Sequence, residues 1–217
     1  MTSKEFPLDS LITERTVYEF ILTTVGRESG PNAAPVGAKR EKQRVYAELS
    51  SNTQSAANLS MGRLARFNIV TDPFILCSAA FDALPEDEFL EAYQQPPKLR
   101  HSLGDILTRV DSSEHFNRDD DLGKTPFLRF RFKILRTEIS SPAQPPSRGL
   151  CAALEAMIKI TRAKVALRRG KADLSAELCR EAREALSVAA RISKHESMQK
   201  TVRMCESELN DIMRGVR

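Results

Sequence analysis

The chain has 217 residues, of which 41% are hydrophobic and 29% charged, and its 33 basic and 29 acidic side chains give a formal net charge of +4. This length can bury a sizeable core without disulfide or metal staples, and the composition excludes a disordered or fibrous class. Because basic and acidic residues are interleaved, we expect no nucleic-acid partner. No apolar run approaches the roughly 18 residues of a membrane span, and residues 1–5 lack signal-peptide features, so we expect a cytoplasmic protein without membrane association.

The first part of the chain predicts short strands. Residues 16–25 are rich in β-branched and aromatic side chains and end at the breaks Gly26 and Gly30-Pro31. Further strands are expected at 32–38 and 44–50, separated by a charged turn at 39–43, so the chain opens as an antiparallel meander. Ser55 is a natural N-cap for a short helix over 56–65. A strand at 67–71 then ends at Asp72-Pro73.

The middle of the chain is mixed. Residues 74–84 and 86–93 have helical patterns, and 103–110 fits either a helix or a strand. Residues 127–139 place Phe130, Phe132 and Ile134 on one face and basic residues on the other, which is typical of a half-buried strand. Interleaved aromatic and basic residues also suit single-stranded nucleic acid, but a strand with one solvent face produces the same pattern and is favoured.

A helical region ends the chain. Residues 140–148 contain three prolines and form the expected linker. Apolar stripes then predict three amphipathic helices, separated by Gly170 and residues 193–197. Such helices must pack on one another, on the preceding domain or on a second subunit. We therefore expect a first domain over 1–139, a linker over 140–148 and a helical domain over 149–217.

Cysteine and histidine are scattered, and no CxxC pair is present, so the sequence predicts no metal site. Cys151, Cys179 and Cys205 fall on or near apolar positions of the helical patterns, where a reduced cysteine behaves as a small hydrophobe. We expect all three to pack in the core.

One segment suits a phosphate. Thr53, Gln54 and Ser55 stand directly before the predicted short helix, and Asn58 lies in its first turn. A helix N-terminus offers backbone N–H groups and a favourable dipole to an anion. Serine and threonine also cap helices that bind nothing, and for this segment alone the capping interpretation is the stronger one.

A second segment suits a flat ring. Asn32, Ala33, Ala34 and Pro35 begin a strand with small side chains directly after a Gly-Pro turn, so that a ligand could approach the backbone closely. A tight hairpin start explains the same residues equally well.

The order of these segments is more informative than either segment alone. The runs TTVGRESGPNAAPVG, TQSAANL and FNIVTDP together resemble a family of archaeal and bacterial FMN-binding split-barrel proteins related to the flavin reductases, the domain-of-unknown-function family 447. The family pattern is similar to a TT strand, NAAP-x-G, S-x-T-x-x-N-L and V-N-I. Thr53 and Ser55 stand in swapped order relative to that pattern, which keeps both hydroxyls. The run LEAMIKITR also resembles the start of the family's helical part.

The resemblance implies a mainly β plus α fold, with an FMN-binding split β-barrel followed by a C-terminal α-helical bundle. It further implies a homodimer with the flavin ring at or near the subunit interface. The FMN-binding residues that it implies are Thr24, Asn32, Ala33, Ala34, Pro35, Thr53, Gln54, Ser55 and Asn58.

The sequence offers no committed catalytic residue. The sequence contains no recognisable Ser–His nucleophile and base, no pair of catalytic carboxylates and no Walker-type phosphate loop. Any catalysis would therefore be carried by the flavin. The leading hypothesis is a flavin reductase-like oxidoreductase that takes hydride from NADH or NADPH. The alternative is a non-enzymatic flavin-binding module, such as a carrier, redox sensor or assembly factor, that acts through its helical domain.

Overall fold

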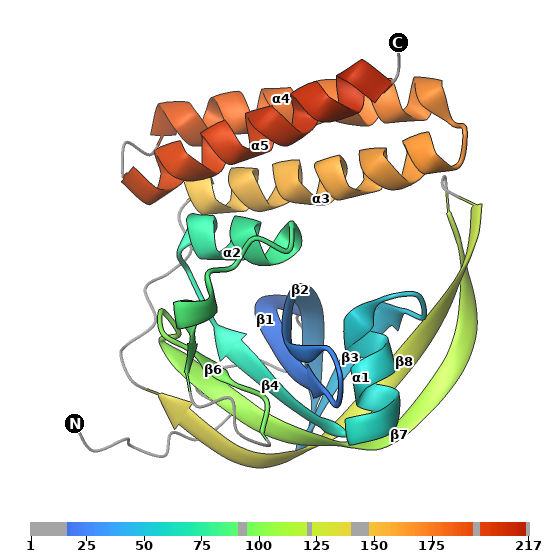
Figure 1. Cartoon of the computed structure of the whole chain (residues 1–217), viewed down its shortest axis with the longest axis vertical. Coiled ribbons are helices and arrows are strands. Elements are labelled where there is room, and N and C mark those ends of the chain that lie inside the picture. Colours follow the sequence, from blue (N-terminus) through green and yellow to red (C-terminus); the bar gives the residue numbers. More distant parts are fainter. Residues whose placement is uncertain (1–16, 91–94, 121–122, 140–147, 193–195, 216–217) are drawn as a thin grey trace. The chain divides into compact units, whose positions relative to one another are not determined.

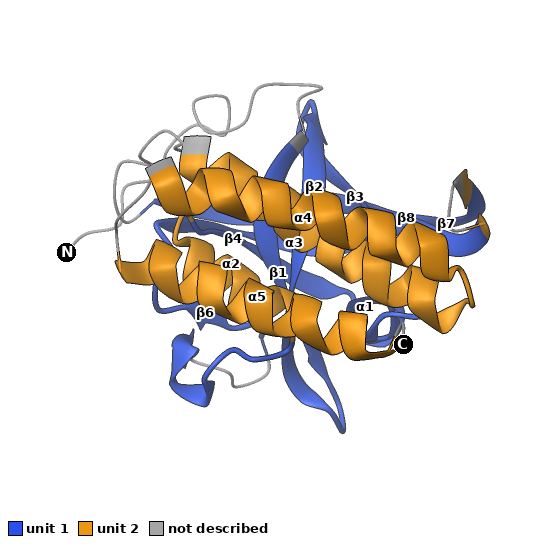
Figure 2. Cartoon of the chain, turned by 90° about the horizontal axis from the view of Figure 1, so that it is seen from above, with its two compact units in different colours: residues 1–70, 82–118, 124–143 blue, residues 71–81, 119–123, 144–217 orange. Residues whose placement is uncertain are grey.

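The structure, a computed structural model, describes residues 17–90, 95–120, 123–139, 148–192 and 196–215. The chain divides into two compact units (Figure 2). The barrel unit draws on residues 1–70, 82–118 and 124–143, and the helical unit on 71–81, 119–123 and 144–217. The helical unit thus includes a segment, 71–81, that the sequence placed within the first domain. Of the predicted linker at 140–148, residues 140–147 lie outside the described residues, and Arg148 begins the first C-terminal helix.

The barrel unit is a closed barrel of six strands in the order β1-β2-β3-β8-β7-β4. Its described strand pairs are antiparallel. A separate two-stranded sheet pairs β5 with β6. Figure 1 shows the long strands β7 and β8 running together. The strands are β1 (Val17–Gly26), β2 (Gly30–Glu41), β3 (Arg44–Ser50), β4 (Leu64–Ile69), β5 (Phe89–Leu90), β6 (Lys98–Leu99), β7 (Gly104–Asp120) and β8 (Gly123–Ile139).

The hairpin of β1 and β2 fixes which residues of the two strands lie opposite each other. β1 and β2 pair without a bulge from Val17↔Lys39 to Gly26↔Gly30. Gly30 has φ +69°, a left-handed conformation that glycine adopts without steric cost. β2 continues to Glu41, so the expected charged turn at 39–43 is shorter than predicted, and Lys42 takes a positive φ within it.

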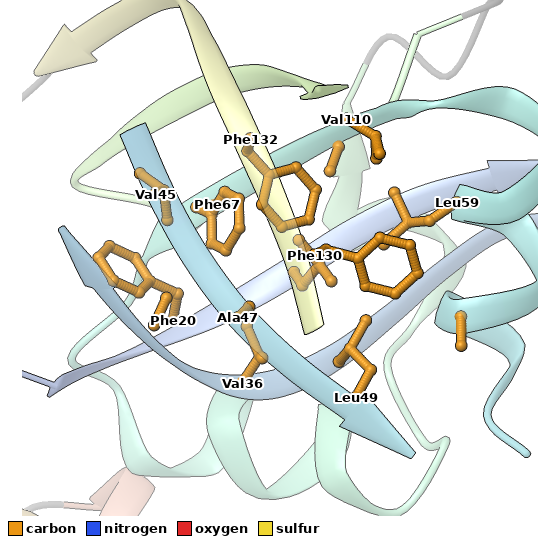
Figure 3. Close-up of a cluster of buried hydrophobic side chains, with 14 of the residues drawn as sticks. Phe20, Val36, Val45, Ala47, Leu49, Leu59, Phe67, Val110, Phe130 and Phe132 are labelled. Atoms are coloured by element: carbon orange, nitrogen blue, oxygen red, sulfur yellow. The ribbon is translucent and has the colours of Figure 1, made fainter. Parts of the chain in front are cut away.

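Aromatic side chains from several strands fill the barrel (Figure 3). Phe67 meets Phe20 and Phe132 edge-to-face, with ring centroids 5.7 and 5.1 Å apart, the geometry that aromatic quadrupoles favour. Phe130 and Phe132 point inward, as the alternation in 127–139 predicted. α1 (Gln54–Gly62) contributes Ala56 and Leu59 to the same core. Burial of this apolar face anchors the short helix to the barrel.

The helical unit consists of α2 (Pro73–Ala80), α3 (Arg148–Arg168), α4 (Ala172–Ile192) and α5 (Glu196–Gly215). The prediction of three C-terminal helices is confirmed by α3, α4 and α5. Asp72 caps α2, since its Oδ1 accepts from the Phe74 N–H at 2.8 Å. Within the described residues, no helix is both long and apolar enough to span a membrane.

Several sequence expectations were wrong. The helix expected over 86–93 is absent from the described residues 86–90, where Glu86–Glu88 is a 3₁₀ turn followed by β5; residues 91–94 lie outside the described part of the chain. The sequence left 103–110 open between helix and strand, and residues 104–110 belong to β7. α1 begins after Thr53 rather than Ser55, and it ends at Gly62 because Arg63 adopts φ 59° and β4 starts directly afterwards. Cys151 is exposed, whereas Cys179 and Cys205 are buried as expected.

Candidate functional site

The N-terminus of α1 presents donors that the chain itself does not use. Thr53 Oγ1 accepts from the Ala56 N–H at 3.3 Å and donates to the Ser50 carbonyl at 2.9 Å. This cap satisfies only one of the orphan amides of the first turn. Within the described residues, the backbone N–H groups of Gln54 and Ser55 have no acceptor. Two amides and the positive end of the helix dipole therefore remain available to an anion.

Side chains from three elements form a hydrogen-bond network beside this helix start. Asn32 of β2 donates from Nδ2 to Ser55 Oγ at 2.8 Å. Asn58 Nδ2 donates to Thr24 Oγ1 of β1 at 3.0 Å, and its Oδ1 accepts from Gln54 Nε2 at 2.8 Å. Thr24 and Asn32 are paired directly across the β1–β2 ladder. The structure thus brings together five of the residues that the sequence proposed.

Burial makes this network rigid. Thr24, Ser55 and Asn58 are at most 2% exposed, so their polar groups depend on one another rather than on water. Ser55 therefore does not cap the helix, as the sequence suggested, but joins it to β2. Gln54 is exposed and sits at the surface end of the network.

The network includes one residue that the sequence analysis missed. Ser29, in the turn between β1 and β2, accepts from Gln54 Nε2 at 3.2 Å and so ties the turn to the helix start. Serine is common in turns, and nothing in the sequence distinguishes Ser29 from a turn residue without a role in binding.

Gly26 allows the close approach of these groups. A Cβ at this position would lie 2.2 Å from Ser29 Oγ and 2.6 Å from Asn58 Oδ1. Both distances are far below van der Waals contact. The absence of a side chain at Gly26 is therefore a condition for the geometry of the network.

The remaining predicted residues divide between the two faces of β2. Side chains alternate along a strand, so Ala34 shares the face of Asn32, while Ala33 and Pro35 lie on the opposite face with Gly37. Ala33 is buried, and Ala34 and Pro35 are half-buried. The structure therefore does not gather residues 32–35 on one side of the strand.

A cleft of about 370 Å³ lies on the face of the barrel to which Gly37 contributes. Its arginines are held in place: Glu48 binds Arg118 at 2.6 Å and Arg129 at 2.8 Å. Each guanidinium also stacks on an aromatic ring of β7 or β8, with centroid distances of 4.2 and 4.9 Å. The full lining is Gly37, Lys39, Tyr46, Ala47, Glu48, Arg118 and Arg129.

The described residues contain no group of three or more His, Cys, Asp or Glu side chains that could hold a metal ion. His101 Nδ1 lies 2.7 Å from Glu88 Oε2, a pair that sequence reasoning missed. Glu88 is buried, and its Oε1 also accepts from the His101 backbone N–H at 2.9 Å. Both oxygens of the Glu88 carboxylate bind His101 and so connect the chain before β5 to the chain after β6. This structural role accounts for the pair without a catalytic function.

The chain was compared with solved structures. An FMN-bound protein of Methanosarcina mazei, assigned to the DUF447 family, is 22% identical with a TM-score of 0.73, covering 93% of this chain and 100% of that chain. A flavin reductase in complex with NADP⁺ is 11% identical with a TM-score of 0.49 over 64% of this chain and 88% of its own. A flavin reductase domain protein of Arthrobacter sp. FB24 is 9% identical with a TM-score of 0.48 over 64% and 86%. At these identities the likeness concerns the fold, and only the first carries weight.

No curated protein sequence matches the chain. The family profile described as protein of unknown function (DUF447), N-terminal domain, matches residues 18–141, which is more than half of the chain. This match confirms the resemblance inferred from the sequence, and the chain belongs to the DUF447 family.

Proposed function

We propose that this protein binds FMN in the barrel unit, with the phosphate at the N-terminus of α1. The observation that carries this proposal is the pair of backbone amides, of Gln54 and Ser55, that the Thr53 cap leaves without an acceptor. A phosphate accepts several hydrogen bonds and gains from the helix dipole, so these amides suit it.

The side chains fit the same ligand. Ser55 Oγ accepts from Asn32, and its own proton has no acceptor among the residues that the structure describes. Gln54 is exposed and offers a side-chain amide at the same helix start. The buried bonds of Asn58 to Thr24 and Gln54 hold the helix start against β1, so the donors are positioned before any ligand arrives.

The FMN-bound state of the Methanosarcina mazei protein supports the choice of FMN over another phosphorylated ligand. For the ring we propose the segment 32–35 of β2, where the small side chains, Ala34 on one face and Ala33 and Pro35 on the other, allow close approach to the backbone. The predicted homodimer, with the ring at or near the subunit interface, is part of this proposal. Light scattering on the purified protein measures that oligomeric state.

The finer proposal is a flavin reductase-like oxidoreductase with NADH or NADPH as hydride donor. FMN, when bound, supplies the redox chemistry, and the residues around α1 bind and orient it. Among the described residues of the α1 network, no nucleophile is paired with a base, which agrees with a purely positioning role.

The phosphate site is tested by introducing a negative charge, with a matched control. Gln54→Glu is nearly isosteric and exposed, and an acidic residue in the first helical turn suits the dipole, so we expect the fold to be retained although the bond from Nε2 to Asn58 Oδ1 is lost. Its charge repels a phosphate, and FMN affinity should fall about tenfold or more. Gln54→Ala loses the same bond without adding a charge, and should therefore bind FMN more tightly than Gln54→Glu. Ser60→Glu adds the same charge at an exposed position near the end of the same helix and should bind FMN normally. Equal affinities of Gln54→Glu and Ser60→Glu would place the phosphate elsewhere.

Turnover is tested separately. Under anaerobic conditions, the oxidised flavin of an enzyme should be bleached by NADH or NADPH. Bound FMN that neither donor reduces would support the non-enzymatic carrier or sensor instead.

A further inference from the structure

Two buried cysteines meet in the helical unit. Cys77 lies in α2 and Cys205 in α5, and their Sγ atoms are 3.5 Å apart. Both residues are 0% exposed. α2 and α5 belong to the same compact unit and pack against each other. The two thiols are thus in direct contact although 128 positions separate them in the chain.

The surroundings favour neutral sulfur. Val202 and Leu209, on the Cys205 face of α5, are buried, and so are the α2 neighbours of Cys77. The hydrogen bond to Cys205, the burial of the thiol and the nearby Glu208 carboxylate raise the pKa of Cys77 far above that of a free cysteine. Glu208 itself pairs with Lys164 of α3. A disulfide carries no charge, so its formation would bury none here.

The geometry requires little rearrangement. A disulfide places the sulfur atoms about 2.05 Å apart, so the existing contact has to shorten by about 1.5 Å. The other cysteines are not arranged in this way. Cys151 is exposed on α3 and Cys179 is buried in α4, and neither has a sulfur neighbour within the described part of the chain.

We propose that Cys77 and Cys205 form an intramolecular disulfide that covalently joins α2 to α5. With a small-molecule disulfide such as oxidised glutathione as oxidant, one cysteine thiolate attacks the oxidant and releases one glutathione thiol. The second cysteine then displaces the other glutathione from the mixed disulfide. In total, two S–H bonds break, one protein S–S bond forms, and the two electrons and two protons reduce the oxidant to two thiols.

Burial sets the conditions for the reaction. Because neither sulfur is accessible in the folded unit, oxidation of the native protein requires local opening and should be slow. The bond should instead form readily as the chain folds in an oxidising buffer. Once formed, it closes a loop of more than 100 residues and restricts the unfolded chain, which stabilises the helical unit.

The test refolds the full-length chain from urea in a mixture of reduced and oxidised glutathione, then blocks free thiols in acid. Trypsin releases Cys77 in the peptide 67–98 and Cys205 in the peptide 204–214. We expect mass spectrometry to find these peptides linked, with two alkylated thiols left, at Cys151 and Cys179. The oxidised protein should unfold about 5–10 °C above the reduced protein.

Two variants control the result. Cys205→Ala should abolish both the linked peptide and the rise in Tm, whereas Cys151→Ser, at an exposed position, should keep both. Four free thiols after oxidative refolding, or a link to Cys151 or Cys179, would overturn the proposal. The wild-type mass spectrum decides this even if Cys205→Ala fails to fold. A linked protein with an unchanged Tm would refute the claim that the bond joins the two helices in their folded arrangement.

Discussion

Gly26→Ala is the substitution that tests the α1 network most sharply, because it adds one methyl group where the structure has no room. The new Cβ would lie 2.6 Å from Asn58 Oδ1 and 2.2 Å from Ser29 Oγ. Ser29 is exposed and can rotate away. Asn58 is 2% exposed and is held by Thr24 and Gln54, so its movement breaks existing hydrogen bonds.

The magnitude follows from these contacts. To restore an ordinary separation of 3.4 Å, the Asn58 amide must move by about 0.8 Å, which the bonds of 3.0 and 2.8 Å to Thr24 and Gln54 do not survive. A buried polar group left without its partner costs about 1–3 kcal/mol. Two such losses lower the free energy of unfolding by about 2–6 kcal/mol, or Tm by roughly 4–24 °C for a chain of this size.

Thermal unfolding followed by circular dichroism measures this loss, and Gly62→Ala is the matched control. A Cβ at Gly62 meets only the Val25 carbonyl oxygen at 3.6 Å, which is ordinary contact. Since alanine also favours the helix, Gly62→Ala should leave stability unchanged or slightly raised. Equal Tm values for the two variants would refute the steric account of Gly26.

Three further substitutions test other parts of the structure by the same unfolding assay. Thr53→Ala removes the α1 cap and should cost about 1 kcal/mol, while Thr53→Ser should cost little; equal losses would exclude the capping role. Phe132→Ala empties the centre of the barrel core and should cost about 3–5 kcal/mol, and a loss under 1 kcal/mol would contradict that packing. The hydrogen bond and charge of Lys159 lower the pKa of Glu181, so this pair stabilises the protein above the ordinary glutamate pKa, and its contribution is lost as pH falls through the lowered pKa. The Tm difference between wild type and Glu181→Gln should therefore shrink in acid, and a difference constant with pH would contradict the assignment.

Elements with a strong local pattern were predictable from the sequence. The alternation around Phe130 and Phe132 gave β8, and the apolar stripes gave the three C-terminal helices. The failures were local ambiguities that long-range contacts resolve. Residues 86–88 form a 3₁₀ turn instead of the expected helix, directly before β5 pairs with β6. The segment 103–110 was open between helix and strand, and pairing of β7 with β4 makes 104–109 extended. At α1, both Thr53 and Ser55 are good caps, and only the bond from Asn32 shows that Ser55 is engaged elsewhere.

The candidate site was predictable in its residues more than in its arrangement. Asn32 is bonded to Ser55 and Asn58 to Thr24, and the β1–β2 pairing of Thr24 with Asn32 places the two bonds side by side. The sequence contained no sign of the Asn58–Thr24 bond or of Ser29. The sequence analysis treated residues 32–35 as one binding surface because they are consecutive. Side chains alternate along a strand, so Ala33 lies on the face opposite Asn32.

The Cys77–Cys205 contact could not have been predicted from sequence. The two residues lie in different helical patterns, and only the packing of α2 on α5 brings them together.

The flavin content of the purified protein tests the central claim most directly. The account predicts a yellow protein that releases FMN on denaturation, or a colourless protein that binds one added FMN per chain and loses that binding in Gln54→Glu but not in Ser60→Glu. A colourless protein that fails to bind added FMN would contradict it.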